Sequence, residues 1–276
     1  MNNLAPPLID ASTGSLSNED RVAAILSRVY EQGFQSIDLL ATLFGVTTQT
    51  IRRDVNALCD QGLCRRRHGG IDVLPAGENV AYATRRVLDR EAKRRIARCV
   101  ADAVPEGASL FFGIGTTPEQ CAQALIDRAR LRVMTNNLNV ATVLSRNPSC
   151  EITIAGGRLR NLDGDVIAGE AHGFFSRFSV DIGIYGVGGV GEGGELLDFN
   201  QDEVRMRTEL ASHCRQRFLV LDHTKFGRGA TVRGGLITEA DHVFTDRPVP
   251  DRIASLLDAA GVTLTVAPPV ASPTHP

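Results

Sequence analysis

The chain lacks a charge excess of either sign. Its 276 residues carry 30 Lys and Arg against 32 Asp and Glu, a formal net charge of −2. A globally basic surface is therefore excluded, and any nucleic-acid signal must be local. Because 43% of the residues are hydrophobic, the chain can bury a large core and has room for two domains.

Long apolar runs and clustered cysteines are also missing. No stretch reaches the roughly 20 apolar residues of a membrane-spanning helix, and no secretory signal pattern opens the chain. We therefore expect a reduced, cytoplasmic protein with no membrane partner. Cys59, Cys64 and His68 suggest a metal site, but structural zinc needs four ligands and no fourth lies nearby. We expect no metal and interpret Cys59 as a buried helix thiol.

The most informative stretch reads TTQTIRRDVNALCDQGLCRRRHGG. It begins with Thr47 and Thr48, residue types that favour a helix start. Ile51, Val55 and Leu58 then recur at the spacing of one buried helical face. Two more amphipathic helices precede it, so the order is that of a helix-turn-helix.

The opposite face of this helix suits the reading of DNA bases. Arg pairs with guanine edges in the major groove, and Gln and Asn pair with adenine edges. Three arginines then lead into a His-Gly-Gly turn, which indicates a wing beside the phosphate backbone of double-stranded DNA. A small helical domain with a solvated charged face is the simpler alternative. The candidate DNA-binding residues are Thr48, Gln49, Thr50, Arg52, Arg53, Arg67 and His68.

The pattern changes after residue 108. Short apolar runs alternate with helical segments, which predicts an α/β domain with a mostly parallel sheet. We expect strands at 110–112, 131–134, 152–155, 180–185, 218–221, 243–244 and 262–266. We expect helices at 118–130, 138–145, 200–213 and 250–260.

Glycines, hydroxyls, amides and one lysine follow these predicted strands. Open α/β sheets bind ligands at the carboxyl ends of their strands, and a Gly-Thr-Thr turn before a helix can bind an anion through its N–H groups. This inventory fits a small sugar or polyol phosphate, although ordinary helix capping remains the alternative for the Gly-Thr-Thr turn. No dinucleotide fingerprint is present, so we expect no cofactor. The candidate effector-binding residues are Gly115, Thr116, Thr117, Asn136, Asn137, Gly156, Gly157 and Lys225.

These motifs resemble those of the DeoR-type bacterial transcriptional regulators. The resemblance rests on TIRRDVNALCDQGL and RRRHGG in the first half, and on GIGTTPE, TNNLNVA, AGGRLR, DGDVIAGEA, LLDFNQDEVR and DHTKFGR in the second. It implies an N-terminal helix-turn-helix and a C-terminal sensor similar to the ribose-5-phosphate isomerase and CoA-transferase fold. It also implies a repressor that binds palindromic operators as a dimer or tetramer. A phosphorylated metabolite would release it, and the likeness within the family points to glycerol-3-phosphate.

Composition and periodicity together give the expected domain organisation. Residues 1–17 and 268–276 are expected to be disordered, and 74–90 to be a linker. We expect a winged helix-turn-helix domain over 18–73, with the helix-turn-helix at about 36–55, and a sensor over 91–267.

Three positions depart from the family pattern. Gly113 stands in place of the usual Asp, which alters effector choice or affinity if that carboxylate binds an effector hydroxyl. Thr224 replaces Ser and keeps the hydroxyl, whereas Asn200 replaces Asp and exchanges a carboxylate for an amide.

Two other functions remain open on the sequence. A sugar-phosphate isomerase would need a base beside its substrate, for which Asp198, Asp222 and Glu203 are candidates, but no acid–base pair stands out. We therefore expect no enzyme activity. A transcriptional activator would have the same architecture as a repressor.

Overall fold

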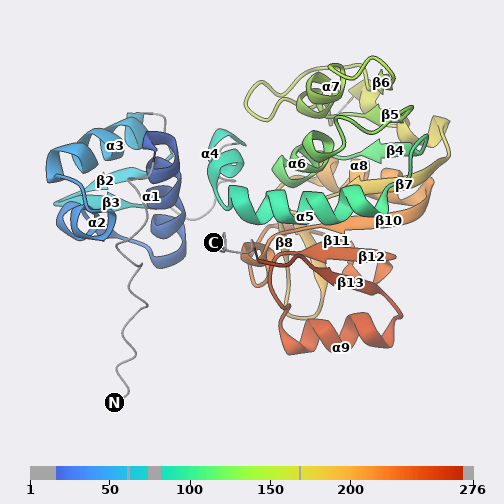
Figure 1. Ribbon diagram of the computed structural model, residues 1–276. Coiled ribbons are helices and arrows are strands. Elements are labelled where there is room, and N and C mark those ends of the chain that lie inside the picture. Colours follow the sequence, from blue (N-terminus) through green and yellow to red (C-terminus); the bar gives the residue numbers. More distant parts are fainter. Residues whose placement is uncertain (1–16, 61–62, 74–81, 168, 270–276) are drawn as a thin grey trace, which may run out of the picture. The chain divides into compact units, whose positions relative to one another are not determined.

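The computed structural model describes residues 17–60, 63–73, 82–167 and 169–269. The chain forms two compact units, which divide between Leu88 and Asp89 (Figure 1). The expected disordered segments lie almost entirely outside the described residues, as do residues 74–81 of the expected linker. The end of that linker forms helix α4, Tyr82–Val87.

The N-terminal unit has the predicted order of helices. Helix α1 spans Asn18–Gln32, α2 spans Ile37–Phe44 and α3 spans Thr48–Asp60. The side chain of Ser36 accepts a hydrogen bond from the N–H of Leu39 at the start of α2, and Gly45 ends that helix in a left-handed conformation.

A small sheet completes this unit. Strand β2, Arg65–Arg67, and strand β3, Gly70–Asp72, form the predicted hairpin. The sequence did not reveal β1, Gln35–Ser36, which pairs with β3. The predicted core positions Ile51, Val55 and Leu58 are all buried against α1 and α2.

The described part of the C-terminal unit contains a seven-stranded parallel sheet of order β13-β12-β10-β7-β4-β5-β6. All seven predicted strands are present, with ends shifted by a few residues. Their bounds are β4 Ser109–Phe112, β5 Arg132–Thr135, β6 Glu151–Ile154, β7 Val180–Tyr185, β10 Cys214–Val220, β12 His242–Thr245 and β13 Thr263–Val266.

Each face of this sheet carries its own apolar core, since successive side chains of a strand point to opposite faces. Leu110 and Phe112 pack with one set of helices, whereas Phe111 packs with the other. The first core joins α5, Arg90–Ala103, α6, Thr116–Ala124, and α7, Leu138–Leu144 (Figure 1).

The second core joins α8, Gln201–Ser212, and α9, Asp251–Ala259. Four short 3-10 helices are described as well: η1 Gly169–Ala171, η2 Phe175–Arg177, η3 His223–Lys225 and η4 Ile237–Glu239.

A second small sheet was not predicted. Strands β8, Gly189–Val190, β9, Glu195–Asp198, and β11, Val232–Leu236, pair antiparallel in the order β11-β9-β8. Together with α8, this sheet brings side chains to the carboxyl end of the large sheet. No helix among the described residues is long and apolar enough to cross a membrane.

Candidate functional site

Helix α3 presents its candidate DNA-binding side chains to solvent. Thr48, Gln49, Arg52 and Arg53 are exposed, whereas Thr50 is half-buried. The Thr47 hydroxyl accepts a hydrogen bond from the N–H of Thr50 at 3.2 Å, so Thr47 caps the helix. The cap and the buried Ile51 face therefore leave the other face of α3 available to a ligand.

Asp54 does not belong to that exposed face. Its side chain is 7% exposed, and its carboxylate accepts two hydrogen bonds from Arg21 of α1, at 2.7 and 3.2 Å. This bidentate pair joins α1 to α3. The exposed face of α3 is consequently more basic than the composition of the stretch suggests.

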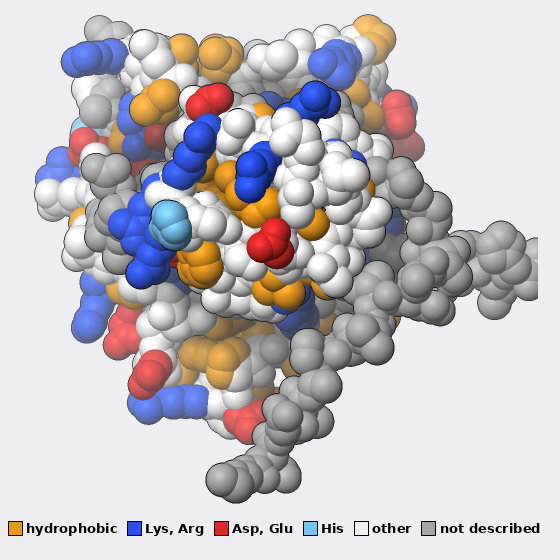
Figure 2. All heavy atoms as spheres, turned by 90° about the vertical axis from the view of Figure 1, so that its left-hand side faces the viewer, with side chains coloured by type: hydrophobic (Ala, Val, Ile, Leu, Met, Phe, Trp, Pro, Cys, Tyr) orange, Lys and Arg blue, Asp and Glu red, His pale blue; other side chains and the backbone are white. Residues whose placement is uncertain are grey.

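The wing is basic along its whole first strand. Arg65, Arg66 and Arg67 are exposed, as is His68 in the turn. Arg67 donates to Asp72 at 3.2 Å, which holds its side chain against the hairpin. Figure 2 shows Lys and Arg side chains gathered beside a histidine on this unit. Gly70 is required here, because a Cβ atom would lie 2.2 Å from the carbonyl oxygen of Gln35.

We expect Arg52→Ala or Arg53→Ala to weaken specific operator binding by about 1–3 kcal/mol, the cost of losing one bidentate base contact. The fold should survive because both side chains are exposed. Titrations against operator and random DNA measure the effect.

Arg67→Ala is the control. It should weaken the complexes with operator and with random DNA alike, and it should lower the salt dependence of binding by about one phosphate contact. Unchanged operator affinity in both α3 variants would contradict the assignment.

The predicted anion site lies beyond the carboxyl end of β4, where helix α6 begins. Gly115 adopts φ 115°, a left-handed conformation that favours glycine. Thr116 and Thr117, the first residues of α6, are 6% and 5% exposed. The first N–H groups of a helix lack intrahelical partners, so this terminus is suited to an anion.

Lys225 lies after β10, within η3. The sheet order places β10 and β4 on either side of β7, so their ends are about 10 Å apart, two strand spacings. The residue that follows β7 is Gly186, where a Cβ atom would lie 3.4 Å from the carbonyl oxygen of Val220 and 3.6 Å from the ring of Pro118, so the chain segments pack closely here. A phosphate could be held between the α6 terminus and Lys225.

Beside Lys225 lies a buried carboxylate, that of Asp222. Burial would raise the pKa of Asp222, but the charges of Lys225 and Lys93 and hydrogen bonds from Thr224 hold that pKa below its ordinary value. The Nζ atom of Lys93 is 3.8 Å from Asp222 Oδ2, and the two side chains are 3% and 1% exposed. Lys93 was not among the predicted effector-binding residues.

Another ion pair follows the neighbouring strand β12. Nδ1 of His223 lies 2.9 Å from Oδ2 of Asp246, and this hydrogen bond raises the pKa of His223. Asp246 also lies 3.6 Å from Arg95 of α5. Helix α5 is therefore tied by both Lys93 and Arg95 to the loops at the carboxyl end of the sheet.

The two asparagines after β5 have different roles. Asn137 caps α7, because its Oδ1 accepts hydrogen bonds from the N–H groups of Asn139 and Val140. Asn136, which is 1% exposed, lines a pocket. Gly156 and Gly157, after β6, are exposed and do not line it.

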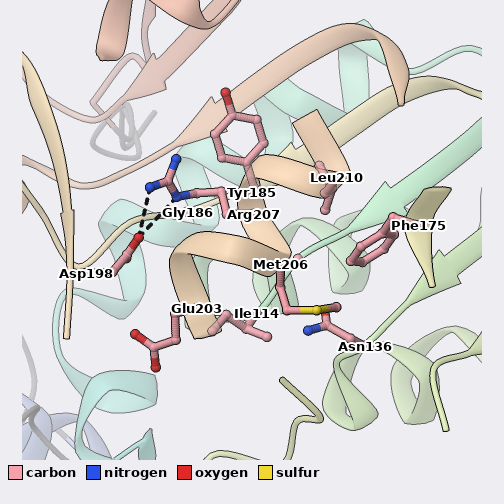
Figure 3. A pocket seen from close by; sticks show the side chains of 11 residues that line it. Ile114, Asn136, Phe175, Tyr185, Gly186, Asp198, Glu203, Met206, Arg207 and Leu210 are labelled. Atoms are coloured by element: carbon pink, nitrogen blue, oxygen red, sulfur yellow. Dashed lines mark hydrogen bonds and ion pairs between the residues drawn. The ribbon is translucent and has the colours of Figure 1, made fainter. Parts of the chain in front are cut away.

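This pocket lies between the carboxyl end of the sheet and helix α8 (Figure 3). The space among its lining residues, together with the solvent at its open mouth, amounts to about 300 Å³. Of the predicted effector-binding residues, Asn136 lines this pocket. Gly113, the position that departs from the family pattern, lines it as well. Gly115, Thr116, Thr117 and Lys225 are not part of its lining, which consists of Gly113, Ile114, Asn136, Phe175, Tyr185, Gly186, Asp198, Glu203, Met206, Arg207 and Leu210.

The three residues weighed as a metal site lie in different surroundings. Cys64 is buried in the core of the N-terminal unit, and burial raises the pKa of its thiol to about 12. Cys59 is half-buried rather than fully buried, and His68 is exposed in the wing. Within the described segments, no three His, Cys, Asp or Glu residues are grouped so as to hold a metal ion.

Comparison with known proteins matches both units to one family. Residues 21–75 match the DeoR-like helix-turn-helix domain, and residues 88–247 match the DeoR C terminal sensor domain. The glycerol-3-phosphate regulon repressor of Escherichia coli K12 is 41% identical over 242 residues, which cover 88% of this chain and 96% of that protein. The repressor of the same name from Haemophilus influenzae is also 41% identical, over 84% of this chain and 91% of its own.

Among solved structures, ribose 5-phosphate isomerase A of Methanocaldococcus jannaschii matches with a TM-score of 0.38 and 13% identity, over 50% of this chain and 55% of that one. The family models cover the helix-turn-helix and most of the parallel sheet. The protein is therefore a DeoR-family repressor, with an N-terminal helix-turn-helix domain and a C-terminal sensor domain.

Proposed function

We propose that this protein represses a glycerol-3-phosphate catabolic regulon and leaves its operator DNA when glycerol-3-phosphate binds the sensor unit. The observation that carries the proposal is the 41% identity, over 96% of its length, to a repressor named for that regulon. We further propose that it acts in the cytoplasm, as a dimer or tetramer on palindromic operators.

The phosphate is proposed to bind between the N-terminus of α6 and Lys225. Supporting this site are the glycine at the helix start and the strand order that aligns the two loops. Lys93 and Lys225 both act electrostatically on the Asp222 carboxylate, and Glu119 adds a second buried carboxylate in the first turn of α6. We propose that Lys225 supplies the cation for the phosphate and that the α6 terminus supplies the N–H donors.

An isomerase is the weaker alternative. A general base must be able to take a proton from the substrate. Asp222 has a lowered pKa, Asp198 accepts from Arg207 at 3.1 Å, and Glu203 accepts from Arg160 at 2.8 Å. Carboxylates held by cations are poor bases, so we propose that the protein is not an enzyme. Incubation with ribose-5-phosphate, with detection of the ketose, tests this.

We expect Lys225→Ala to yield a repressor that glycerol-3-phosphate no longer releases. A charge-assisted hydrogen bond is worth about 1.5–3 kcal/mol, so effector affinity should fall roughly 10- to 100-fold. Operator affinity should stay normal, because α3 is unchanged. Calorimetry with glycerol-3-phosphate and operator titrations with and without it give the two values.

A matched control for Lys225→Ala is Arg215→Ala. It removes a cation whose side chain is 78% exposed and which lies near the opposite, amino end of the same strand, β10. Glycerol-3-phosphate should release the Arg215→Ala variant from operator DNA as readily as it releases the wild type. Release of the wild type by unphosphorylated glycerol, or an unaltered response of Lys225→Ala, would contradict the phosphate site.

A further inference from the structure

Among the described residues that line the pocket in Figure 3, one buried side-chain polar atom has no hydrogen-bond partner. Nδ2 of Asn136 donates to the carbonyl oxygen of Val166 at 2.9 Å, and this bond fixes which end of the amide is nitrogen. Oδ1 of Asn136 is buried and accepts no hydrogen bond from any described residue. A buried acceptor without a donor costs about 1–3 kcal/mol, so a ligand that supplies one gains affinity here.

The charged residues of the pocket are already engaged. Arg207 donates to Asp198 at 3.1 Å and to the carbonyl oxygen of Gly234 at 2.6 Å. Glu203 accepts from Arg160, which lies outside the lining, at 2.8 Å. The lining thus carries two carboxylates against one guanidinium, a net negative charge. Such a lining repels phosphate and favours a hydroxyl, which can donate to an acceptor.

The remaining wall is apolar. Ile114, Phe175, Met206 and Leu210 supply it, and in Figure 3 Phe175 and Leu210 lie apart from the polar group of Asp198 and Arg207. Apolar side chains contact carbon atoms of a ligand without hydrogen bonding. A short carbon chain that bears hydroxyl groups therefore matches both sides.

We propose that this pocket is a hydroxyl subsite, in which Oδ1 of Asn136 accepts a hydrogen bond from a hydroxyl of the effector's carbon chain. The inference rests on the proposed function, since it assigns the phosphate to the separate region at α6 and Lys225. Asn136 is then a specificity-determining residue: it distinguishes a polyol phosphate from an alkyl phosphate of the same size.

Calorimetry on the full-length wild type tests the subsite with four probes. These are glycerol-3-phosphate, 3-hydroxypropyl phosphate without the central hydroxyl, propyl phosphate without either hydroxyl, and inorganic phosphate. We expect propyl phosphate to bind roughly 10- to 100-fold more weakly than glycerol-3-phosphate, a loss typical of an unpaired buried acceptor. The 3-hydroxypropyl ester shows which hydroxyl matters.

The Asn136→Leu variant should lose most of the preference for glycerol-3-phosphate over propyl phosphate. Its affinity for inorganic phosphate should remain that of the wild type. Asn147→Leu is the control, because Asn147 also donates to a backbone carbonyl, that of Arg128, but lies outside the pocket. Its preference should equal that of the wild type. If Asn136→Leu fails to fold, the wild-type comparison of the probes decides alone.

The outcomes separate the subsite from the proposed function. Equal wild-type affinity for glycerol-3-phosphate and propyl phosphate would overturn the subsite and leave the phosphate sensor intact. An unaltered preference in folded Asn136→Leu would also overturn the role of Asn136. Failure of the wild type to bind any phosphate would refute the proposed function itself, and with it the subsite.

Discussion

Ile51→Asp should unfold the N-terminal unit and abolish operator binding. The Ile51 side chain is fully buried among residues of α1, α2 and α3. The variant loses about 2–5 kcal/mol of apolar packing and also places a charge in the core without a partner. A small domain is stable by only about 5–15 kcal/mol, so the sum is enough to unfold it.

Two measurements on Ile51→Asp check this. Circular dichroism should show the loss of part of the helical signal, and gel shifts should show no operator complex. The sensor unit has its own cores and should bind glycerol-3-phosphate as before. Asn56→Asp is the control, since it adds the same charge to the exposed face of α3 and should leave the unit folded. A melting temperature of Ile51→Asp equal to that of the wild type would contradict the description of this core.

Arg160→Leu should destabilise the sensor unit by about 3–5 kcal/mol, the usual cost of removing one member of a buried ion pair. Arg160 donates twice to Asp165, at 2.6 and 2.8 Å, and once to Glu203, at 2.8 Å. Those two carboxylates are 2% and 8% exposed. Leucine keeps much of the apolar stem but leaves both carboxylates without this cation.

The melting temperature of the sensor unit reports the effect. For a unit of this size, about 3–5 kcal/mol corresponds to a decrease of roughly 6–20 °C. Effector affinity should also fall, because Glu203 lines the pocket. Arg94→Leu is the control: its pair with Glu91 is exposed, and such helical pairs contribute about 0.3–0.5 kcal/mol. Equal melting temperatures for the two variants would show that the Arg160 network is not stabilising.

The sequence was most informative where burial is continuous. The central strands β4 and β7 are buried on both faces, so they appear as apolar runs, whereas the edge strands β6 and β13 are partly exposed. Strands β1 and β8 have two residues each, and β8 lies among glycines, so no periodicity marks them. The pocket depends on β9 and α8, and its location therefore required the structure.

Polar residues were harder to assign, because their burial depends on distant partners. The Asp54 side chain is buried because Arg21 donates a hydrogen bond to it, and the Lys93 side chain is buried because it forms an ion pair with Asp222. Adjacent asparagines show the same limit. Asn137 caps a helix and Asn136 retains an unbonded oxygen, although both follow one strand in the sequence.

The bond between Arg21 and Asp54 has a consequence for how operator preference can evolve. It anchors α3 through its inner face, together with the apolar residues on that side. Substitutions at Gln49, Arg52 or Arg53 therefore leave the orientation of the helix unchanged. Related repressors could diverge to new operators by exchanging these side chains alone, without any compensating change in the scaffold or in the response to effector.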